Sequence, residues 1–292
     1  MFNQPNGQVW NLKGAAYSSL KDFFAAYAVK AQQYFINPAK ETTLVSENGM
    51  RITFSPFSFS DQYGRIVTDE VQILLQEIHS WQELIFSGLV TGSGDRFLES
   101  AGPFNLSAYH KDGHLRLRQN FTVEFPVGNI PYNQPARLFR GSTSITRTLR
   151  GRKVFDWEEV SSKGLKIRRI KGEKYYHFEL GSFNWWNCQY YYNKKANRAM
   201  VSVRLPINLD RVADKMAFLV VEDLNAVVMM YAHAYSFTAL NIPTKLPARL
   251  LLLAYNEGQF YFHQQVIAET AKIMIDAQMM PVKESDILTA LG

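Results

Sequence analysis

The sequence predicts a mainly β protein with two β-sandwich-like domains, an N-terminal amphipathic helix and a short C-terminal helix. Many short segments alternate apolar and polar side chains or are rich in β-branched residues, which is typical of half-buried strands. Tight-turn signals such as Asn48-Gly49 and Asp112-Gly113 separate several of these segments. Short strands that bury only one face need a second sheet to pack against, so we expect sandwiches.

Residues 1–34 are predicted to form an N-terminal arm and a helix. Between residues 17 and 34, apolar side chains recur at helical spacing: Leu20, Phe23, Phe24, Tyr27, Ala28 and Ala31. Ser18 or Ser19 precedes this pattern and can serve as the N-cap. The helix is expected either to join the core or to pack on a partner.

Residues 35–126 are predicted to form the first β-sandwich domain. Phe54, Phe57 and Phe59 flank Pro56 in this region. Proline cannot donate a ladder hydrogen bond, which confines Pro56 to an edge or to the start of a strand. We expect the phenylalanines to close one end of the sandwich, each contributing roughly 1.5–3 kcal/mol if it is fully buried.

Residues 127–174 are predicted to be a basic, irregular insertion or linker, because Gly, Pro and Ser/Thr interrupt any strand pattern. Twelve Lys/Arg and four Asp/Glu lie between Arg137 and Lys174, so this segment carries +8 and the rest of the chain −2. A charge excess confined to one segment indicates a solvated or partner-facing surface. The basic residues expected to bind a partner are Arg147, Arg150, Arg152, Lys153, Lys166, Arg168, Arg169 and Lys171.

Residues 175–292 are predicted to form the second β-sandwich domain, with a hairpin at Asn256-Glu257-Gly258 and a closing helix capped by Ser285. Its first strands are rich in tryptophan and tyrosine. Exposed aromatic rings can stack on sugar rings, whereas strand alternation buries about half of them. The candidate stacking residues are Trp185, Trp186, Tyr190 and Tyr191.

No catalytic, cofactor-binding or metal-binding residue is predicted. The chain has no Gly-rich phosphate loop, no G-x-S-x-G elbow and no H-E-x-x-H motif, and its single cysteine, Cys188, rules out a disulfide within the chain. His110 and His114 have metal-ligand spacing, but the Asp112-Gly113 turn between them favours exposed turn histidines.

No apolar run is long enough to cross a bilayer. The basic segment is also compatible with nucleic acid, but acids are mixed into it, and we do not expect a nucleic-acid partner.

A family resemblance rests on residues in both halves of the chain. The first half contains Gly49-Met50-Arg51-Ile52-Thr53-Phe54, Pro56, Phe59, Glu77, Thr91, Leu98-Glu99-Ser100-Ala101-Gly102 and Phe104, and the second contains SFNWWNCQYYY at residues 182–192. These motifs resemble a large group of Bacteroidota proteins, many of them surface lipoproteins. Trp186 replaces the usual aliphatic residue and Gln189 the usual acid. The resemblance spans about residues 20–292 without the basic segment.

More distantly, the first half is similar to the β-sandwich interaction domain of ankyrins, netrin receptors and zonula occludens proteins. Some animal relatives of that domain cleave themselves at a Phe-Ser bond with the help of a nearby histidine. Ser58-Phe59-Ser60 mimics the cleaved tripeptide but sits at a proline-bearing strand start without an adjacent upstream histidine. The resemblance therefore implies an interaction domain, with self-cleavage as an alternative.

Together, these features predict a non-enzymatic structural or adaptor protein that contacts other subunits of a larger assembly, as a homo- or hetero-oligomer. The assembly is expected to be a phage-like particle, an injection apparatus or a cell-surface complex. A carbohydrate-binding surface protein and a self-cleaving interaction domain are the alternatives. The first residues show no export signal, so we expect the cytoplasm or a particle assembled there, or the cell surface if a leader has been removed.

Overall fold

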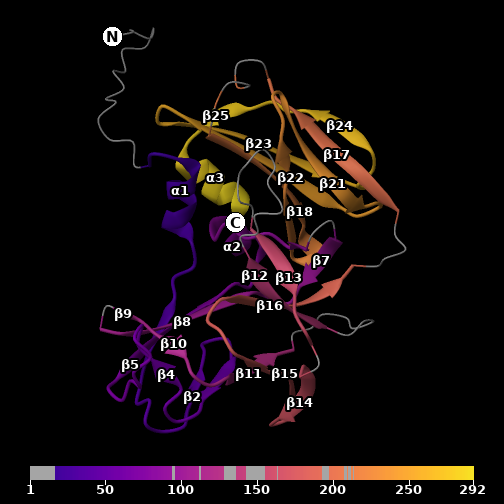
Figure 1. Ribbon diagram of the computed structural model, residues 1–292. Helices are drawn as coiled ribbons and strands as arrows, with labels where there is room; N and C mark the ends of the chain where they lie inside the picture. Colours follow the sequence, from indigo (N-terminus) through magenta and orange to yellow (C-terminus); the bar gives the residue numbers. More distant parts are fainter. Residues whose placement is uncertain are drawn as a thin grey trace.

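The computed structural model describes residues 17–93, 96–111, 113–127, 136–142, 155–162, 164–192, 197–206, 209, 212 and 214–292. The described chain folds into an N-terminal lobe and a C-terminal lobe, both built of mainly antiparallel β-sheets, with helices beside the C-terminal lobe (Figure 1). The prediction of a mainly β protein with a helix near each end is confirmed.

The N-terminal lobe is a sandwich of two sheets. Sheet 1 has the strand order β1-β5-β8-β16-β12-β13, with β7 beside β16, β6 beside β7 and β9 beside β8. Its strands are β1 (Gln32–Ile36), β5 (Val71–Glu77), β6 (Gly92–Ser93), β7 (Arg96–Ser100), β8 (Phe104–His110), β9 (Gly113–His114), β12 (Arg137–Ser142), β13 (Asp156–Glu159) and β16 (Trp185–Tyr191). Sheet 2 has the order β14 (Lys166–Ile170), β15 (Glu173–Leu180), β11 (Phe121–Pro126), β3 (Arg51–Phe54) and β2 (Thr42–Val45). The short strands β4 (Phe59–Ser60) and β10 (Arg116–Leu117) pair beside them.

Side-chain alternation positions the core of this lobe. Val71, Ile73 and Leu75 on β5 are fully buried, while the residues between them are only half-buried. They pack against inward-facing residues of sheet 2 such as Phe121 and Val123. Each such side chain contributes roughly 1.5–3 kcal/mol by leaving water, which is why the alternating pattern dictates the face that each strand turns inward.

The C-terminal lobe is a second sandwich. Sheet 3 has the order β20 (Tyr231–Ala232), β21 (Ser236–Pro243), β17 (Arg198–Arg204) and β24 (Ile273–Asp276), and β17 and β24 run parallel. Sheet 4 has the order β19 (Ala226–Met229), β18 (Asp214–Val221), β22 (Ala248–Asn256), β23 (Gln259–Ile267) and β25 (Met280–Val282), with the 3-10 turn η3 (Glu222–Leu224) before β19. The hairpin predicted at Asn256-Glu257-Gly258 is confirmed by the pairing of β22 with β23.

Sheet 4 is covered on both faces, which explains the continuous apolar run in β22. Leu250 and Leu252 face sheet 3, whereas Leu251 and Leu253 face the helices. The helices are α1 (Leu20–Tyr27), α2 (Trp81–Phe86) and α3 (Glu284–Leu291). Among the described residues, no helix is long and apolar enough to pass through a bilayer.

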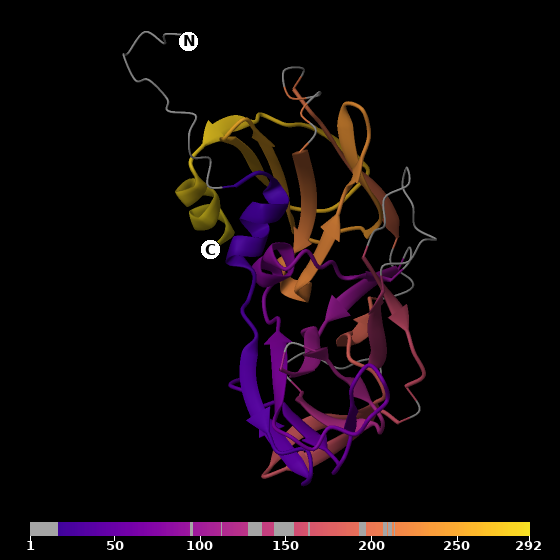
Figure 2. The ribbon, with the colours of Figure 1, turned by 60° about the vertical axis from the view of Figure 1, so that its left-hand side comes forward.

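Helix α1 packs on the C-terminal lobe, although it precedes the N-terminal lobe in the chain (Figure 2). The Tyr17 hydroxyl donates to Glu284 at 2.8 Å, and the Leu20 amide donates to Asp214 at 2.6 Å. The Ser19 cap is confirmed, because its hydroxyl accepts from the Asp22 amide. The helix is shorter than the predicted 17–34 range, and its successor β1 pairs with β5 in the other lobe.

The predicted domain boundaries need two corrections. The segment 127–174 is not irregular where it is described, because β12, β13 and β14 lie in it and belong to sheets 1 and 2. In addition, β15 and β16 complete the N-terminal lobe, so the chain passes to the C-terminal lobe between Tyr191 and Arg198 rather than near residue 174. Long-range pairing decides both points, and neither is visible in local composition.

Two local predictions are also corrected. Phe54 and Phe59 are buried as expected, with ring centroids 5.1 Å apart, but Phe57 is 42% exposed and adopts a positive φ of 58°. It therefore lies on the turn surface instead of closing the sandwich. Helix α3 is capped at Lys283, two residues before Ser285, and the Lys283 amide donates to the Asp286 carboxylate at 2.9 Å.

Candidate partner-binding site

The basic residues predicted to bind a partner fall into a described and an undescribed group. Arg147, Arg150, Arg152 and Lys153 lie outside the described residues. Lys166, Arg168 and Arg169 lie on β14, and Lys171 occupies the turn between β14 and β15 with a positive φ of 50°. The structure therefore brings the described basic residues together on one hairpin.

Strand β14 forms one edge of sheet 2. It pairs with β15 on one side, and no other described strand pairs with its second side. Lys166 through Arg169 are exposed, and even the Ile167 side chain is 59% exposed. An edge strand presents unpaired amide and carbonyl groups, and here those groups are surrounded by positive charge.

Lys166 ends a row of charged and polar side chains that crosses the outer face of sheet 2. The strand register aligns Arg51 with Glu124, Glu124 with His177, and His177 with Lys166. The Arg51 guanidinium lies 3.0 Å from Glu124, and His177 Nδ1 lies 3.7 Å from the second oxygen of that carboxylate. Because Arg51 already pairs with Glu124, that carboxylate is occupied and does not neutralise Lys166.

A pocket of about 380 Å³ opens beside the start of β14. Its polar lining is Ser161, Lys166, Arg168, His177 and Glu179, and its apolar floor includes Leu138, Leu165 and Phe178. The sequence did not single out His177 or Ser161. The alternation of buried Tyr176 and Phe178 around His177 was the signal that its ring points to the opposite, outer face.

The aromatic residues predicted to stack on sugars are mostly in the core. Trp186, Tyr190 and Tyr191 are 5–6% exposed, and Trp185 is half-buried. Strand β16 lies inside sheet 1, and both of its faces are covered: Trp186 and Tyr190 pack into the core between sheets 1 and 2, and Tyr191 packs with Leu98, Phe139 and Trp157 on the other face. A buried ring offers no face to a sugar, and the stacking prediction for these three residues is wrong.

Tyr191 instead belongs to a charged cluster on sheet 1. Its hydroxyl donates to the Glu159 carboxylate, while Arg96 and Arg137 lie 4.8 Å and 5.5 Å from its ring centroid. Burial alone would raise the pKa of Glu159, but the hydrogen bonds from Tyr191 and Arg137 and the nearby arginine charges outweigh it, so that pKa is lowered. Burial and the Glu159 contact raise the pKa of Tyr191. The cluster is a set of satisfied charges that ties β7, β12, β13 and β16 together.

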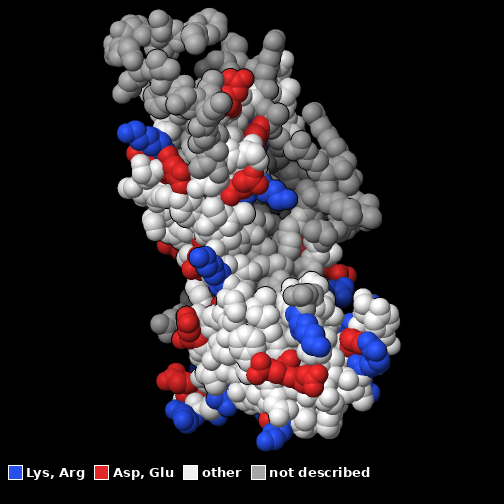
Figure 3. Space-filling view, turned by 90° about the vertical axis from the view of Figure 1, so that its left-hand side faces the viewer, with Lys and Arg blue, Asp and Glu red and all other residues white. Residues whose placement is uncertain are grey.

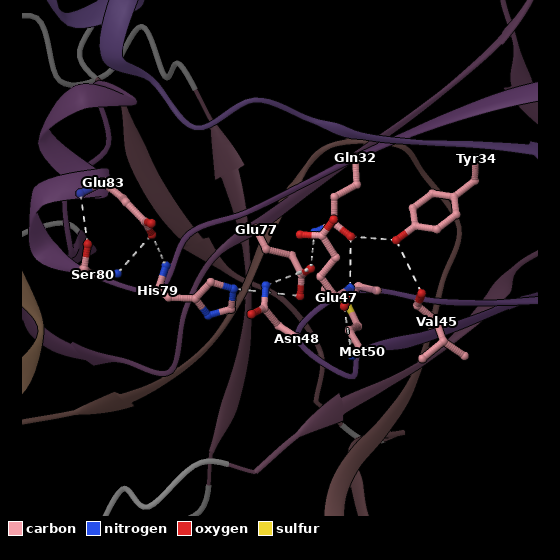
Figure 4. Close-up of polar contacts among 11 residues, drawn as sticks. Gln32, Tyr34, Val45, Glu47, Asn48, Met50, Glu77, His79, Ser80 and Glu83 are labelled. Atoms are coloured by element: carbon pink, nitrogen blue, oxygen red, sulfur yellow. Dashed lines mark hydrogen bonds and ion pairs between the residues drawn. The ribbon is translucent and has the colours of Figure 1, made fainter.

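A second polar cluster surrounds Glu77 at the end of β5 (Figure 4). The buried Glu77 carboxylate accepts from Gln32 at 2.9 Å and from Asn48 at 3.4 Å, and the His79 ring lies 4.0 Å away. Asn48 belongs to the predicted Asn-Gly turn, which is confirmed between β2 and β3. This carboxylate therefore fastens the hairpin turn to β1 and β5, just before the chain enters the capped helix α2.

The remaining candidates from the sequence have structural roles. Ser58 and Phe59 are fully buried, and the Ser58 hydroxyl donates to the Ser55 carbonyl at 2.6 Å. In the β8–β9 hairpin, His110 is opposite Gly113 and His114 is opposite Tyr109. Successive positions on a strand point to opposite faces, so the two histidines do not converge. Among the described residues, no group of three or more metal-ligating side chains is found.

A cavity of about 210 Å³ lies between the lobes. Its walls are mainly apolar and come from β6, β7 and β13 on one side and from β19, β20 and β21 on the other. Arg96 and Asp156 provide charge at its lining. Both charged residues have polar partners in the structure, and the cavity is a smaller feature than the basic pocket.

Comparison with known proteins adds no assignment: no family model matches the chain, and no curated protein matches it.

Proposed function

We propose that this protein is a non-enzymatic adaptor or structural subunit that binds an acidic, extended segment of another protein along β14. The observation that carries the proposal is the edge of β14 that no other described strand covers, with Lys166, Arg168, Arg169 and Lys171 around it. An extended peptide can add to such an edge through main-chain hydrogen bonds, while side-chain charge selects the peptide.

The charge of β14 restricts which strand can pair with it. A second copy of the same basic strand would be repelled, which protects the edge from self-association. An acidic strand would place carboxylates opposite Lys166 and Arg168 on one face and Arg169 on the other. Like-charge repulsion and opposite-charge attraction therefore favour the same partner.

Basic groups do not gather in this way everywhere on the protein. On the face seen in Figure 3, Lys and Arg are interspersed with Asp and Glu and separated by uncharged areas. A partner that needs a run of positive charge along an extended backbone therefore has a distinct target at β14.

The test uses a short peptide that alternates Glu and Val, with a peptide of Gln and Val as its uncharged control. We expect the acidic peptide to bind, to be released by salt, and to slow amide hydrogen exchange across residues 166–170. Reversing Lys166 and Arg168 to Glu should abolish binding. The matched control reverses the exposed Lys40 and Lys272 to Glu, which changes the net charge equally. Binding that survives the β14 reversal, or that leaves amide exchange of β14 unchanged, would contradict the proposal.

A second candidate function is binding of a neutral glycan on the outer face of β1, β5 and β8. The outward side chains there include no Lys, Arg, Asp or Glu: Gln33, Phe35, Gln72, Leu74, Gln76, Asn105, Ser107 and Tyr109. Phe35 is 61% exposed, and amide side chains flank it. Exposed aromatic faces and uncharged amides suit sugar hydroxyls and ring faces. A glycan array in which Phe35→Ala removes every hit would support this candidate, and an array without hits would dismiss it.

A further inference from the structure

The pocket at the start of β14 is lined by several side chains that can donate hydrogen bonds. Lys166 and Arg168 are two residues apart on an edge strand, so both side chains project from the same face. They line the pocket together with His177 and Ser161. Ammonium, guanidinium, imidazole and hydroxyl groups are all hydrogen-bond donors, and such a set matches an oxyanion.

We propose that this pocket binds one compact oxyanion, a carboxylate or a phosphate group carried by the partner segment, and this proposal rests on the proposed function. Arg168 can hold two oxygens of such a group at once, while Lys166 acts as a point charge. The anion would fix the position of the partner along β14, because only one end of the strand carries the pocket.

His177 adds a specific feature to the site. Its Nδ1 is buried and, among the described residues, has no hydrogen-bond partner, with Glu124 Oε1 at 3.7 Å. Because Nδ1 lies on the side of Glu124, Nε2 is the ring nitrogen left to contact a ligand. The bound anion would lie at the end of the row of side chains that runs from Arg51 through Glu124 to His177.

Glu179 is the acidic group in the lining and opposes anion binding. It is exposed, so solvent screens part of its charge. Lys166 and Arg168 outnumber it, and Glu124 is already paired with Arg51. The charged side chains that line the pocket therefore sum to a net positive charge. Removing the Glu179 charge should strengthen anion binding, whereas removing Lys166 or Arg168 should weaken it.

Calorimetric titration of the full chain with inorganic phosphate tests the site without any partner. The double variant Lys166→Gln, Arg168→Gln should bind phosphate about a hundredfold more weakly, since each charged hydrogen bond is worth about tenfold. His177→Gln should weaken binding about tenfold by the same reasoning. Glu179→Gln should strengthen it. The control variant Lys40→Gln, Lys272→Gln has the same change in net charge and should bind like the wild type, and circular dichroism checks that every variant is folded.

Competition experiments identify the source of the oxyanion. Three peptides with the same uncharged sequence carry one Glu, one phosphoserine or one Gln at the same position. We expect the Glu or the phosphoserine peptide, but not the Gln peptide, to displace phosphate. Equal binding by the two double variants, or weaker binding by Glu179→Gln, would overturn the site. If neither charged peptide displaces bound phosphate, the site holds an adventitious ion only, and the assignment of the oxyanion to a partner is overturned.

These outcomes are separable from those of the proposed function. Protection of β14 amides by the acidic peptide can persist in His177→Gln, in which case the strand edge works without the pocket. If the acidic peptide does not protect the β14 amides but phosphate still binds, the oxyanion pocket stands and the proposed strand-edge function fails.

Discussion

Replacing Phe23 by alanine tests whether α1 is an integral part of the C-terminal lobe. Phe23 is fully buried, and its ring centroid lies 4.9 Å from that of Phe260 on β23 and 5.4 Å from that of Tyr17. Phe-to-Ala changes at buried sites cost about 3–5 kcal/mol, because transfer energy is lost and a cavity remains. A domain is stabilised by about 5–15 kcal/mol in total, so this loss is a large fraction.

Urea denaturation followed by tryptophan fluorescence measures the loss. With an m-value of about 3 kcal/mol per molar urea, the midpoint should fall by about 1–2 M. Phe35→Ala is the matched control, since the same side chain is removed from a position that is 61% exposed, and the midpoint should barely change. If Phe23→Ala lowered stability no more than Phe35→Ala, the helix would not be packed on the lobe as described.

Further predictions concern the N-terminal lobe. Gly141→Ala should lower the free energy of unfolding in urea by about 1–3 kcal/mol through overpacking, because its new Cβ would lie 2.7 Å from Cβ of Trp185. An unchanged urea midpoint would mean that Trp185 can move aside without cost. The folded pKa of Glu159 lies below its ordinary value of 4.5, so its contribution to stability is present above pH 4.5 and is lost as pH falls through the folded pKa. The stability difference between wild type and Glu159→Gln should therefore shrink on acidification, and a difference that grows would refute the contacts with Tyr191. Burial raises the pKa of the Cys188 thiol, so thiol reagents should label it only after unfolding, and rapid labelling of the native protein would contradict its position in the core.

The site was only partly predictable from the sequence. The excess of charge identified Lys166, Arg168, Arg169 and Lys171, but not the strand on which they lie. The signal for that strand was Lys171-Gly172, a two-residue turn between KIRRI and the alternating segment that follows. High charge hid the strand, because an edge strand that buries neither face has no apolar alternation to reveal it.

Sequence alone determined the local elements. The alternation around Ile73, the Asn48-Gly49 turn and the helical spacing around Phe23 each depend on interactions within a few residues, and each is present in the structure. Such patterns specify which face of an element is apolar. They do not specify what that face will meet.

Tertiary structure alone decided which surfaces remain available. Trp186 and Tyr190 are buried because they pack into the core between sheets 1 and 2, whereas Lys166 is exposed on β14, which pairs with only one other described strand. Helix α1 packs against β23, more than two hundred residues further along the chain, through the contact of Phe23 with Phe260. The position of a strand in its sheet and the partner of a helix depend on contacts between distant segments, and no local pattern of residues encodes them.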